Sequence, residues 1–252
     1  QTYLSLTYYG DVYLSEDSGN NWTNLTSSVP IINSIYFTNR DTGWAVGGYR
    51  VYVPHYWEYF GYVYKTTNGG TSWVRQDTIL SNILNDVYFI DENFGWAAGD
   101  LLFMRTTDGG SNWIKSSNHE INSIFFLDRN VGYLAGAGSN KIYKTIDGGI
   151  NWFGKEAGTG NELYSVYFSS YQNGYAVGEF GTICHTTNAG ESWTPIERFT
   201  NLDLFDVFFI SDSVGWITGN NGLILKTTNG GVTFIEEENN FTQPKEFLLL
   251  SP

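Results

Sequence analysis

The sequence predicts an all-β protein: a single six-bladed β-propeller with four antiparallel strands in each blade. Three observations lead to this fold class. An eight-residue phrase occurs six times, most copies follow one another at a spacing near forty residues, and short runs rich in Val, Ile, Tyr and Phe lie between them. A fixed spacing of this size is typical of repeat architectures, and four short antiparallel strands per repeat are typical of a propeller blade.

The repeated phrase reads Ser/Thr, any residue, Asp/Asn, any residue, Gly, two further residues and then Trp or Phe. Its copies span residues 15–22, 66–73, 106–113, 145–152, 186–193 and 227–234. An Asp or Asn at the third position can accept a hydrogen bond from the backbone two residues on. A Gly at the fifth position adopts a positive φ without steric cost. We therefore interpret these carboxylates and amides as turn formers and not as catalytic groups.

Each complete repeat contains two strand-like segments before the strand that leads into the phrase, and a fourth strand follows it. Such runs, bounded by Gly, Asn and Asp, favour β-strands. The first strands are predicted at residues 34–37, 86–89, 123–126, 165–168 and 206–209. The second strands are predicted at 43–46, 95–98, 132–135, 174–177 and 215–218.

The N-terminal repeat lacks a first strand. Its segments 3–9, 11–15 and 21–24 align with the second, third and fourth strands of the other repeats. The apolar C-terminal segment 246–250 could supply the missing strand, because an unpaired strand edge and apolar face would otherwise be exposed. We therefore expect residues 1–252 to form one domain whose ring is closed by the C-terminal strand.

Composition disfavours several function classes. The 252 residues carry a formal net charge of −13 with 13 Lys and Arg, so we expect no binding to nucleic acid. No apolar run is long enough to cross a bilayer, so no membrane insertion is expected. The lone cysteine, Cys184, excludes an internal disulfide and a cysteine-based metal site, and we expect an inert thiol. We expect a monomer without a metal or cofactor.

The repeated phrase matches the Asp-box, also called the bacterial neuraminidase repeat. Five repeats also carry Asp/Ser–aliphatic–Tyr/Phe–Phe followed by Gly–Trp/Tyr upstream of the phrase. Together these motifs resemble the photosystem II assembly and stability factor-like repeats, and the resemblance covers almost the whole chain. It implies a propeller fold. It implies little about function, because Asp-box propellers include glycosidases, receptors and assembly factors.

The two ends of the chain bear on localisation. The segment PKEFLLLSP, residues 244–252, resembles the start of the C-terminal sorting domain of proteins exported by the type IX secretion route, without that domain's Asn-Pro-rich continuation. The chain begins at Gln1 without Met, as a processed or a trimmed chain would. We expect a secreted or cell-surface bacterial protein.

One insertion departs from the repeat. The first spacing between closing aromatics is 51 residues, and the excess lies in residues 48–61, between the second and third strands. We expect this segment to overhang the channel mouth, together with His119 from a same-face connection. Aromatic side chains with polar tips suit stacking on sugars or gripping a protein; local packing is the alternative. The candidate ligand-binding residues in the insertion are Arg50, Tyr52, His55, Tyr56, Trp57, Tyr59 and Phe60.

A second candidate is the set of residues that open the first strands, which we expect to surround the channel mouth. They are Ser34, Asp86, Ser123, Ser165, Asp206 and, with the closing strand, Glu246. The three carboxylates Asp86, Asp206 and Glu246 could bind a cation, or two of them could act as an acid–base pair on a glycoside. The alternative is a hydrated channel lining.

These observations favour an extracellular, non-catalytic binding or scaffold module whose ligand is a carbohydrate or a protein. The alternative is a glycoside hydrolase, xyloglucanase-like or sialidase-like. The sialidase family needs three converging arginines and an Arg-Ile-Pro motif, and that motif is absent from the sequence.

Overall fold

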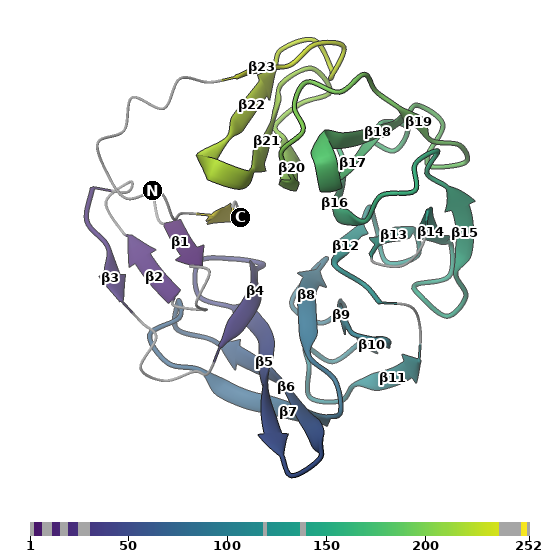
Figure 1. The fold of residues 1–252 in the computed structure, drawn as a ribbon. Helices are drawn as coiled ribbons and strands as arrows, with labels where there is room; N and C mark the ends of the chain where they lie inside the picture. The colour runs from purple at the N-terminus through teal and green to yellow at the C-terminus, as the bar shows by residue number, and fades with distance from the viewer. Residues whose placement is uncertain are drawn as a thin grey trace. The chain divides into compact units, whose positions relative to one another are not determined.

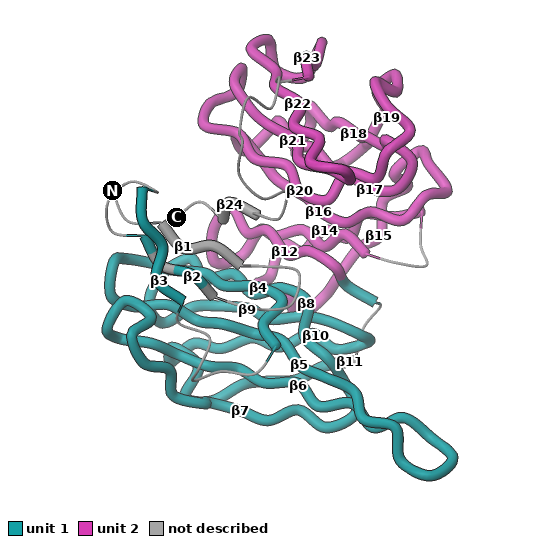
Figure 2. Tube along the Cα trace, turned by 60° about the vertical axis from the view of Figure 1, so that its left-hand side comes forward, with its two compact units in different colours: residues 1–121, 246–252 teal, residues 122–245 magenta. Residues whose placement is uncertain are grey.

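The computed structural model describes residues 3–6, 12–15, 20–24, 31–117, 120–136, 140–236 and 248–250. The chain is all-β over these ranges, where the only helical segments are two 3-10 turns, η2 (Glu179–Gly181) and η3 (Asn220–Gly222). None of the described helical turns is long and apolar enough to span a membrane. The strands form antiparallel four-stranded sheets that can be followed in Figure 1. The chain separates into two compact units, residues 1–121 with 246–252 and residues 122–245 (Figure 2).

Unit 1 contains three sheets, in the orders β24-β1-β2-β3, β4-β5-β6-β7 and β11-β10-β9-β8. The strands of the two complete repeats are β4 (Ile32–Phe37), β5 (Gly43–Val53), β6 (Tyr56–Thr66), β7 (Val74–Leu80), β8 (Leu84–Phe89), β9 (Gly95–Gly99), β10 (Leu102–Thr106) and β11 (Ile114–Ser117). The observed strands β4 and β8 begin two residues before the predicted first strands. Each of them includes a β-bulge that precedes Ser34 or Asp86.

Unit 2 contains three further sheets in the sequential orders β12 to β15, β16 to β19 and β20 to β23. Their strands are β12 (Ser123–Phe126), β13 (Gly132–Ala135), β14 (Lys141–Thr145), β15 (Phe153–Glu156), β16 (Leu163–Phe168), β17 (Gly174–Gly178), β18 (Thr182–Thr186), β19 (Thr194–Pro195), β20 (Leu204–Phe209), β21 (Gly215–Gly219), β22 (Ile224–Thr227) and β23 (Ile235–Glu236). The predicted bounds of β12 and β13 match the structure.

The N-terminal sheet combines β1 (Tyr3–Leu6), β2 (Val12–Ser15) and β3 (Thr23–Asn24) with β24 (Leu248–Leu250). β24 pairs antiparallel with β1, in a register that places Leu4 opposite Leu250 and Leu6 opposite Leu248. The described part of the C-terminal segment therefore adds a strand beside β1, as the sequence predicts, whereas residues 246 and 247 lie outside the described residues. The closed six-bladed ring and the single domain stay predictions.

Aromatic side chains join neighbouring sheets inside each unit. The Trp44 ring of β5 stacks on Phe89 of β8 with a centroid distance of 3.6 Å. The other face of the Phe89 ring lies on its own sheet, where a Cβ on Gly95 would approach the ring to 2.3 Å. The close approach of the Phe89 ring therefore requires a glycine at position 95, and the Trp44 ring packs on the opposite face of Phe89. Unit 2 repeats the stack in the pairs Tyr133–Phe168 and Tyr175–Phe209.

The repeated phrase forms the same hydrogen-bonded turn in its five fully described copies. In the third copy, the Thr106 hydroxyl donates to Asp108 and accepts from the Gly110 N–H, at 2.8 and 2.9 Å. The Asp108 carboxylate in turn accepts from the side chain and the backbone N–H of Asn112, which lowers its pKa. The Asp108 carboxylate thus has its hydrogen-bond donors within its own turn. The first copy lies partly outside the described residues.

Candidate functional site

The insertion at residues 48–61 is a β-hairpin. β5 and β6 each run for eleven residues and stay paired from Gly43 opposite Thr66 out to Val53 opposite Tyr56. Figure 2 shows this hairpin extending from unit 1 beyond the neighbouring strands. The predicted second strand ended at residue 46, which was wrong. Alternating large side chains stabilise paired strands through cross-strand contacts, so the segment continues the ladder and does not form a loop.

Pro54 and His55 form the two-residue turn of this hairpin. His55 has a φ of 84°, a positive value that is uncommon outside glycine. Proline followed by a residue with positive φ is the pattern of a type II turn. The backbone conformation of His55 is therefore part of the turn, and its exposed imidazole lies at the hairpin tip.

One face of the hairpin carries four of the candidate residues. The strand register places Tyr52 opposite Trp57 and Arg50 opposite Tyr59. The Tyr52 and Trp57 rings meet edge to face at 5.1 Å, and the Arg50 guanidinium lies 5.0 Å from the centroid of the Trp57 ring. Tyr52 is 63% exposed and Trp57 is 48% exposed. We call these four residues, Arg50, Tyr52, Trp57 and Tyr59, the Arg50 face.

The other two aromatic candidates lie on the opposite face, because strand side chains alternate. Tyr56 is 58% exposed and donates to Glu58 at 3.1 Å, a hydrogen bond that raises the Tyr56 pKa. Phe60 is half-buried and packs on Tyr49 at 5.4 Å. The candidates predicted as one group are thus split between two faces and the turn, and the remaining candidate, His119, lies outside the described residues.

The hairpin has two open edges. β4 pairs with β5 as far as Gly47, and the last bond on that side runs from the Gly48 N–H to the Ile31 carbonyl at 3.1 Å. On the other side, β7 ends at Leu80 opposite Phe60, where the Ser81 N–H donates to the Tyr59 carbonyl. Beyond these points, β5 and β6 pair only with each other among the described strands.

Asp86 and Asp206, the two described carboxylates that were predicted at the channel mouth, each accept hydrogen bonds. The Ser34 hydroxyl donates to Asp86 at 2.7 Å, and the Ser165 hydroxyl donates to Asp206 at 2.8 Å. Each bond joins the first strands of two neighbouring sheets within one unit. Each carboxylate also accepts the N–H of the residue that follows it, Val87 or Val207. The structure therefore forms Ser–Asp pairs inside each unit. Glu246 lies outside the described residues.

The Asp206 carboxyl group has a raised pKa. Desolvation by burial raises its pKa, against the lowering effect of the bonds from Ser165 and Val207. Burial also raises the pKa of Cys184 to about 12, so that the buried thiol stays protonated. In the described ranges, no group of three His, Cys, Asp or Glu residues could hold a metal ion.

Three asparagine side chains that bind backbone carbonyls escaped the sequence analysis. The side-chain amide of Asn33 donates to the Leu84 carbonyl at 2.8 Å, and Asn85 donates to the Ile121 carbonyl at 2.9 Å. In unit 2, Asn122 donates to the Leu163 carbonyl at 3.0 Å. The signal was an asparagine directly before the residue that opens the predicted first strand. These amides satisfy backbone carbonyls and so have a structural role.

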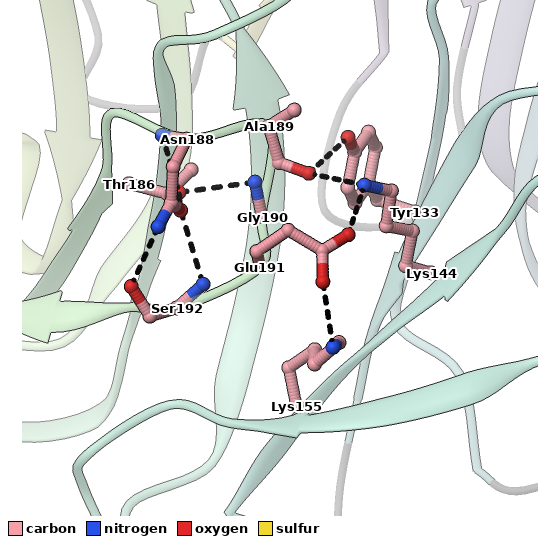
Figure 3. Close-up of polar contacts among 9 residues, drawn as sticks. All are labelled: Tyr133, Lys144, Lys155, Thr186, Asn188, Ala189, Gly190, Glu191 and Ser192. Carbon is pink, nitrogen blue, oxygen red and sulfur yellow. Dashed lines mark hydrogen bonds and ion pairs between the residues drawn. The ribbon is translucent and has the colours of Figure 1, made fainter.

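Figure 3 shows how a repeated turn contacts the preceding sheet. Lys144 of β14 donates to the Ala189 carbonyl at 2.7 Å and pairs with the Glu191 carboxylate at 2.7 Å. Lys155 of β15 pairs with the other oxygen of Glu191 at 2.8 Å. Both lysines lower the Glu191 pKa to about 2. The repeated turns thus connect sheets and leave the hairpin as the stronger candidate for ligand binding.

Comparisons with known proteins support a propeller-like fold built from repeats of this kind. The model of a family described as photosynthesis system II assembly factor YCF48 matches residues 115–202. The structure titled "YCF48 bound to D1 peptide" is similar with a TM-score of 0.69 and 17% identity, covering 92% of this chain and 76% of that one. YCF48 from Cyanidioschyzon merolae gives a TM-score of 0.67 and 16% identity, over 91% and 79% of the two chains.

A glycoside hydrolase has a similar fold as well. The family GH74 xyloglucanase from Xanthomonas campestris gives a TM-score of 0.71 and 14% identity, covering 93% of this chain but 43% of the xyloglucanase. A search of curated protein sequences finds no significant match. Identities this low relate the folds alone and leave function to the site itself.

Proposed function

We propose that the protein is a non-catalytic protein-binding module and that the hairpin at residues 48–61 is its docking element. The observation that carries this proposal is the exposure of Tyr52, Tyr56 and Trp57 on a hairpin that the other repeats lack. Large aromatic side chains and arginine are the residues that most often dominate binding energy at protein interfaces. The three exposed aromatic side chains lie on a two-stranded extension, where they do not contribute to packing between the sheets.

The arrangement on the Arg50 face favours a protein over a carbohydrate ligand. A sugar stacks on a free aromatic face, but one face of the Trp57 ring carries the Arg50 guanidinium, and the Trp57 ring also packs edge to face with Tyr52. The similar fold of YCF48, whose structure is titled as bound to D1 peptide, supports the idea that this architecture can take a peptide. Carbohydrate binding through the same residues is the second ligand class to be tested.

The proposal includes the setting of the module. The sheets are proposed to form one closed six-bladed ring, supported by the pairing of β24 with β1. The protein is proposed to act as a monomer at the bacterial cell surface or outside the cell. The C-terminal resemblance to a sorting domain supports that localisation.

The test compares the intact protein with a variant in which residues 50–59 are replaced by Asn-Gly. This change leaves Tyr49 opposite Phe60 and closes the hairpin with a two-residue turn suited to the strand twist. Each protein is used to capture partners from its source-cell extract, with mass spectrometry as the readout. Val74→Ser, at an exposed apolar position on β7, is the matched control. We expect partners that bind the intact protein and the control but are lost from the shortened variant.

A glycan panel read by tryptophan fluorescence tests the carbohydrate alternative, with Trp57→Ala as the comparison. Glycan binding that disappears in Trp57→Ala would replace the protein ligand with a sugar. Equal capture of all partners by the intact and shortened proteins would contradict the role of the hairpin.

A glycoside hydrolase is the alternative function, and it is favoured by the position of Asp206 beside Ser165, where desolvation raises the pKa of the carboxyl group. A carboxyl group with a raised pKa suits a general acid in glycoside hydrolysis. The similar fold of the xyloglucanase adds support at the level of architecture only. Release of reducing sugar from a polysaccharide panel, abolished by Asp206→Asn or Asp86→Asn, would establish this alternative.

A further inference from the structure

The open edge of β5 presents backbone groups in a defined pattern. The Gly48 N–H points toward β4, because it donates to the Ile31 carbonyl. Backbone groups in a strand alternate sides, so those of Arg50 and Tyr52 point to the same side. No described strand pairs with β5 there, and no further hydrogen bond to either residue is present in the described parts of the chain. Such an edge is a template for pairing with another extended chain.

The side chains beside this edge carry a free cation. The Arg50 guanidinium is exposed, and its only side-chain interaction among the described residues is the contact with the Trp57 ring. The Arg50 face holds no carboxylate, since Glu58 lies on the other face and accepts from Tyr56. A guanidinium fork binds carboxylates through two parallel hydrogen bonds. The ring contact restrains the guanidinium, which lowers the entropy cost of binding.

These two features combine in one place. A residue directly opposite Arg50 on an added antiparallel strand would project its side chain onto the same face as Arg50. An Asp or Glu at that position would meet the guanidinium, while apolar or aromatic neighbours two residues along would meet Tyr52. The exposed edge and the unpaired cation therefore specify one kind of partner.

We propose that the β5 edge at Arg50 and Tyr52 binds an extended, carboxylate-bearing peptide segment of a partner protein as an added β-strand. This inference rests on the proposed protein-binding function, and it specifies how the partner binds and which chemical group of the partner is recognised. Backbone hydrogen bonds supply part of the affinity, and the Arg50–carboxylate pair supplies specificity.

The test starts from a displayed library of random peptides selected on the intact protein and counter-selected on the variant with residues 50–59 replaced by Asn-Gly. We expect recovered peptides to alternate large apolar residues with others and to carry Asp or Glu at a fixed position. A recovered peptide is then synthesised and its Kd measured. Arg50→Gln should weaken binding about tenfold or more, as expected for the loss of a charge-assisted hydrogen bond.

The matched control is Arg75→Gln on β7, because the Arg75 guanidinium also lies over an aromatic ring, 5.8 Å from the centroid of the Tyr62 ring. Its binding should equal that of the intact protein. N-methylation of the peptide at successive positions should weaken binding with a period of two residues, since only alternate amides face β5. Thermal melting of Arg50→Gln confirms that the variant is folded.

Three results would overturn the inference: no enriched peptide, equal binding to Arg50→Gln and Arg75→Gln, or an N-methylation scan without a two-residue period. The absence of an enriched peptide would mean that Arg50 serves only to prevent other chains from pairing with the β5 edge. If the shortened variant still loses its partners in the capture experiment, the proposed function stands and only the added-strand mode fails. If capture is unaffected, the proposed function fails as well.

Discussion

The phenol of Tyr133 donates a hydrogen bond of 2.8 Å to the carbonyl of Ala189, which joins two neighbouring sheets of unit 2. Ala189 is the fourth residue of a repeated turn, and Lys144 donates to the same carbonyl. The equivalent contacts elsewhere run from Trp44 to the Gly109 carbonyl and from Tyr175 to the Gly230 carbonyl. These three turns thus each offer a backbone acceptor to a neighbouring sheet, which gives the repeated turn a structural role.

Substitutions at Tyr133 should separate the hydrogen bond from the ring. Tyr133→Phe keeps the ring on Phe168 and leaves the Ala189 carbonyl bonded to Lys144, so we expect a loss of about 0.5–1 kcal/mol in unfolding free energy. Tyr133→Ala removes a fully buried ring and should cost about 3–5 kcal/mol. Urea unfolding measures both. Equal losses in the two variants would show that the phenol, and not the stacked ring, holds the sheets together.

Ala189→Gly should stabilise the protein. Ala189 has a φ of 56°, whereas the fourth residue of the other fully described turns is a glycine with positive φ. The left-handed conformation costs an alanine about 1–2 kcal/mol, and the extra entropy of glycine in the unfolded chain offsets about 0.4–1 kcal/mol of the gain. Calorimetry should show a Tm rise of about 2 °C. Ala176→Gly, in strand β17, is the control and should lower the Tm.

The Glu191 ion pairs should make stability depend on pH. Lys144 and Lys155 hold the pKa of Glu191 at about 2, below its ordinary value of 4.5. A lowered pKa contributes stability that is complete above the unfolded value and is lost as pH falls toward the folded value. Because the Glu191 side chain is half-exposed, we expect the pairs to contribute less than about 1 kcal/mol.

Glu191→Gln should therefore have a lower Tm than the intact protein at pH 7, and this difference should shrink as pH falls below about 4.5. Thermal melts from pH 7 to pH 3 measure the difference. Asp77→Asn, which breaks the ion pair with Lys115 in unit 1, serves as a comparison at an independent site. A Tm difference between intact protein and Glu191→Gln that stays constant across this range would contradict the assignment.

Removal of the C-terminal strand should destabilise the fold. β24 pairs with β1, so deleting residues 245–252 exposes the edge of β1. We expect the cooperative thermal transition to be lost, whereas deleting only residues 251–252 should leave it in place. A melting curve unchanged by the longer deletion would exclude a closing role for β24.

The local periodic features of the fold were predictable from the sequence. The turn phrase, the glycine that opens each second strand and the bounds of β12 and β13 all follow from short-range steric rules. The bulges before Ser34 and Asp86 were not predicted, because a shift of register depends on how two strands pair and not on composition. Pairing of β24 with β1 was expected from the missing strand and the apolar tail.

The candidate site was predicted in part. The insertion was found from its length and aromatic content, but the continuation of the second strand past residue 46 was missed. Which candidates share a face depends on the register of Tyr52 opposite Trp57, and register is set by pairing rather than by composition. The hydrogen bonds of Asp86 and Asp206 to serines of neighbouring sheets are long-range and could not be read from either residue alone.

The most direct measurement of the central claim is photo-crosslinking from the hairpin in source-cell extract. A photoreactive phenylalanine analogue is placed at Trp57 in one protein and at Val74, exposed on β7, in another. A protein partner that docks on the hairpin predicts a discrete crosslinked protein adduct from position 57 and none from position 74. The absence of an adduct at position 57, or the same adduct from both positions, would contradict the hairpin as the docking element.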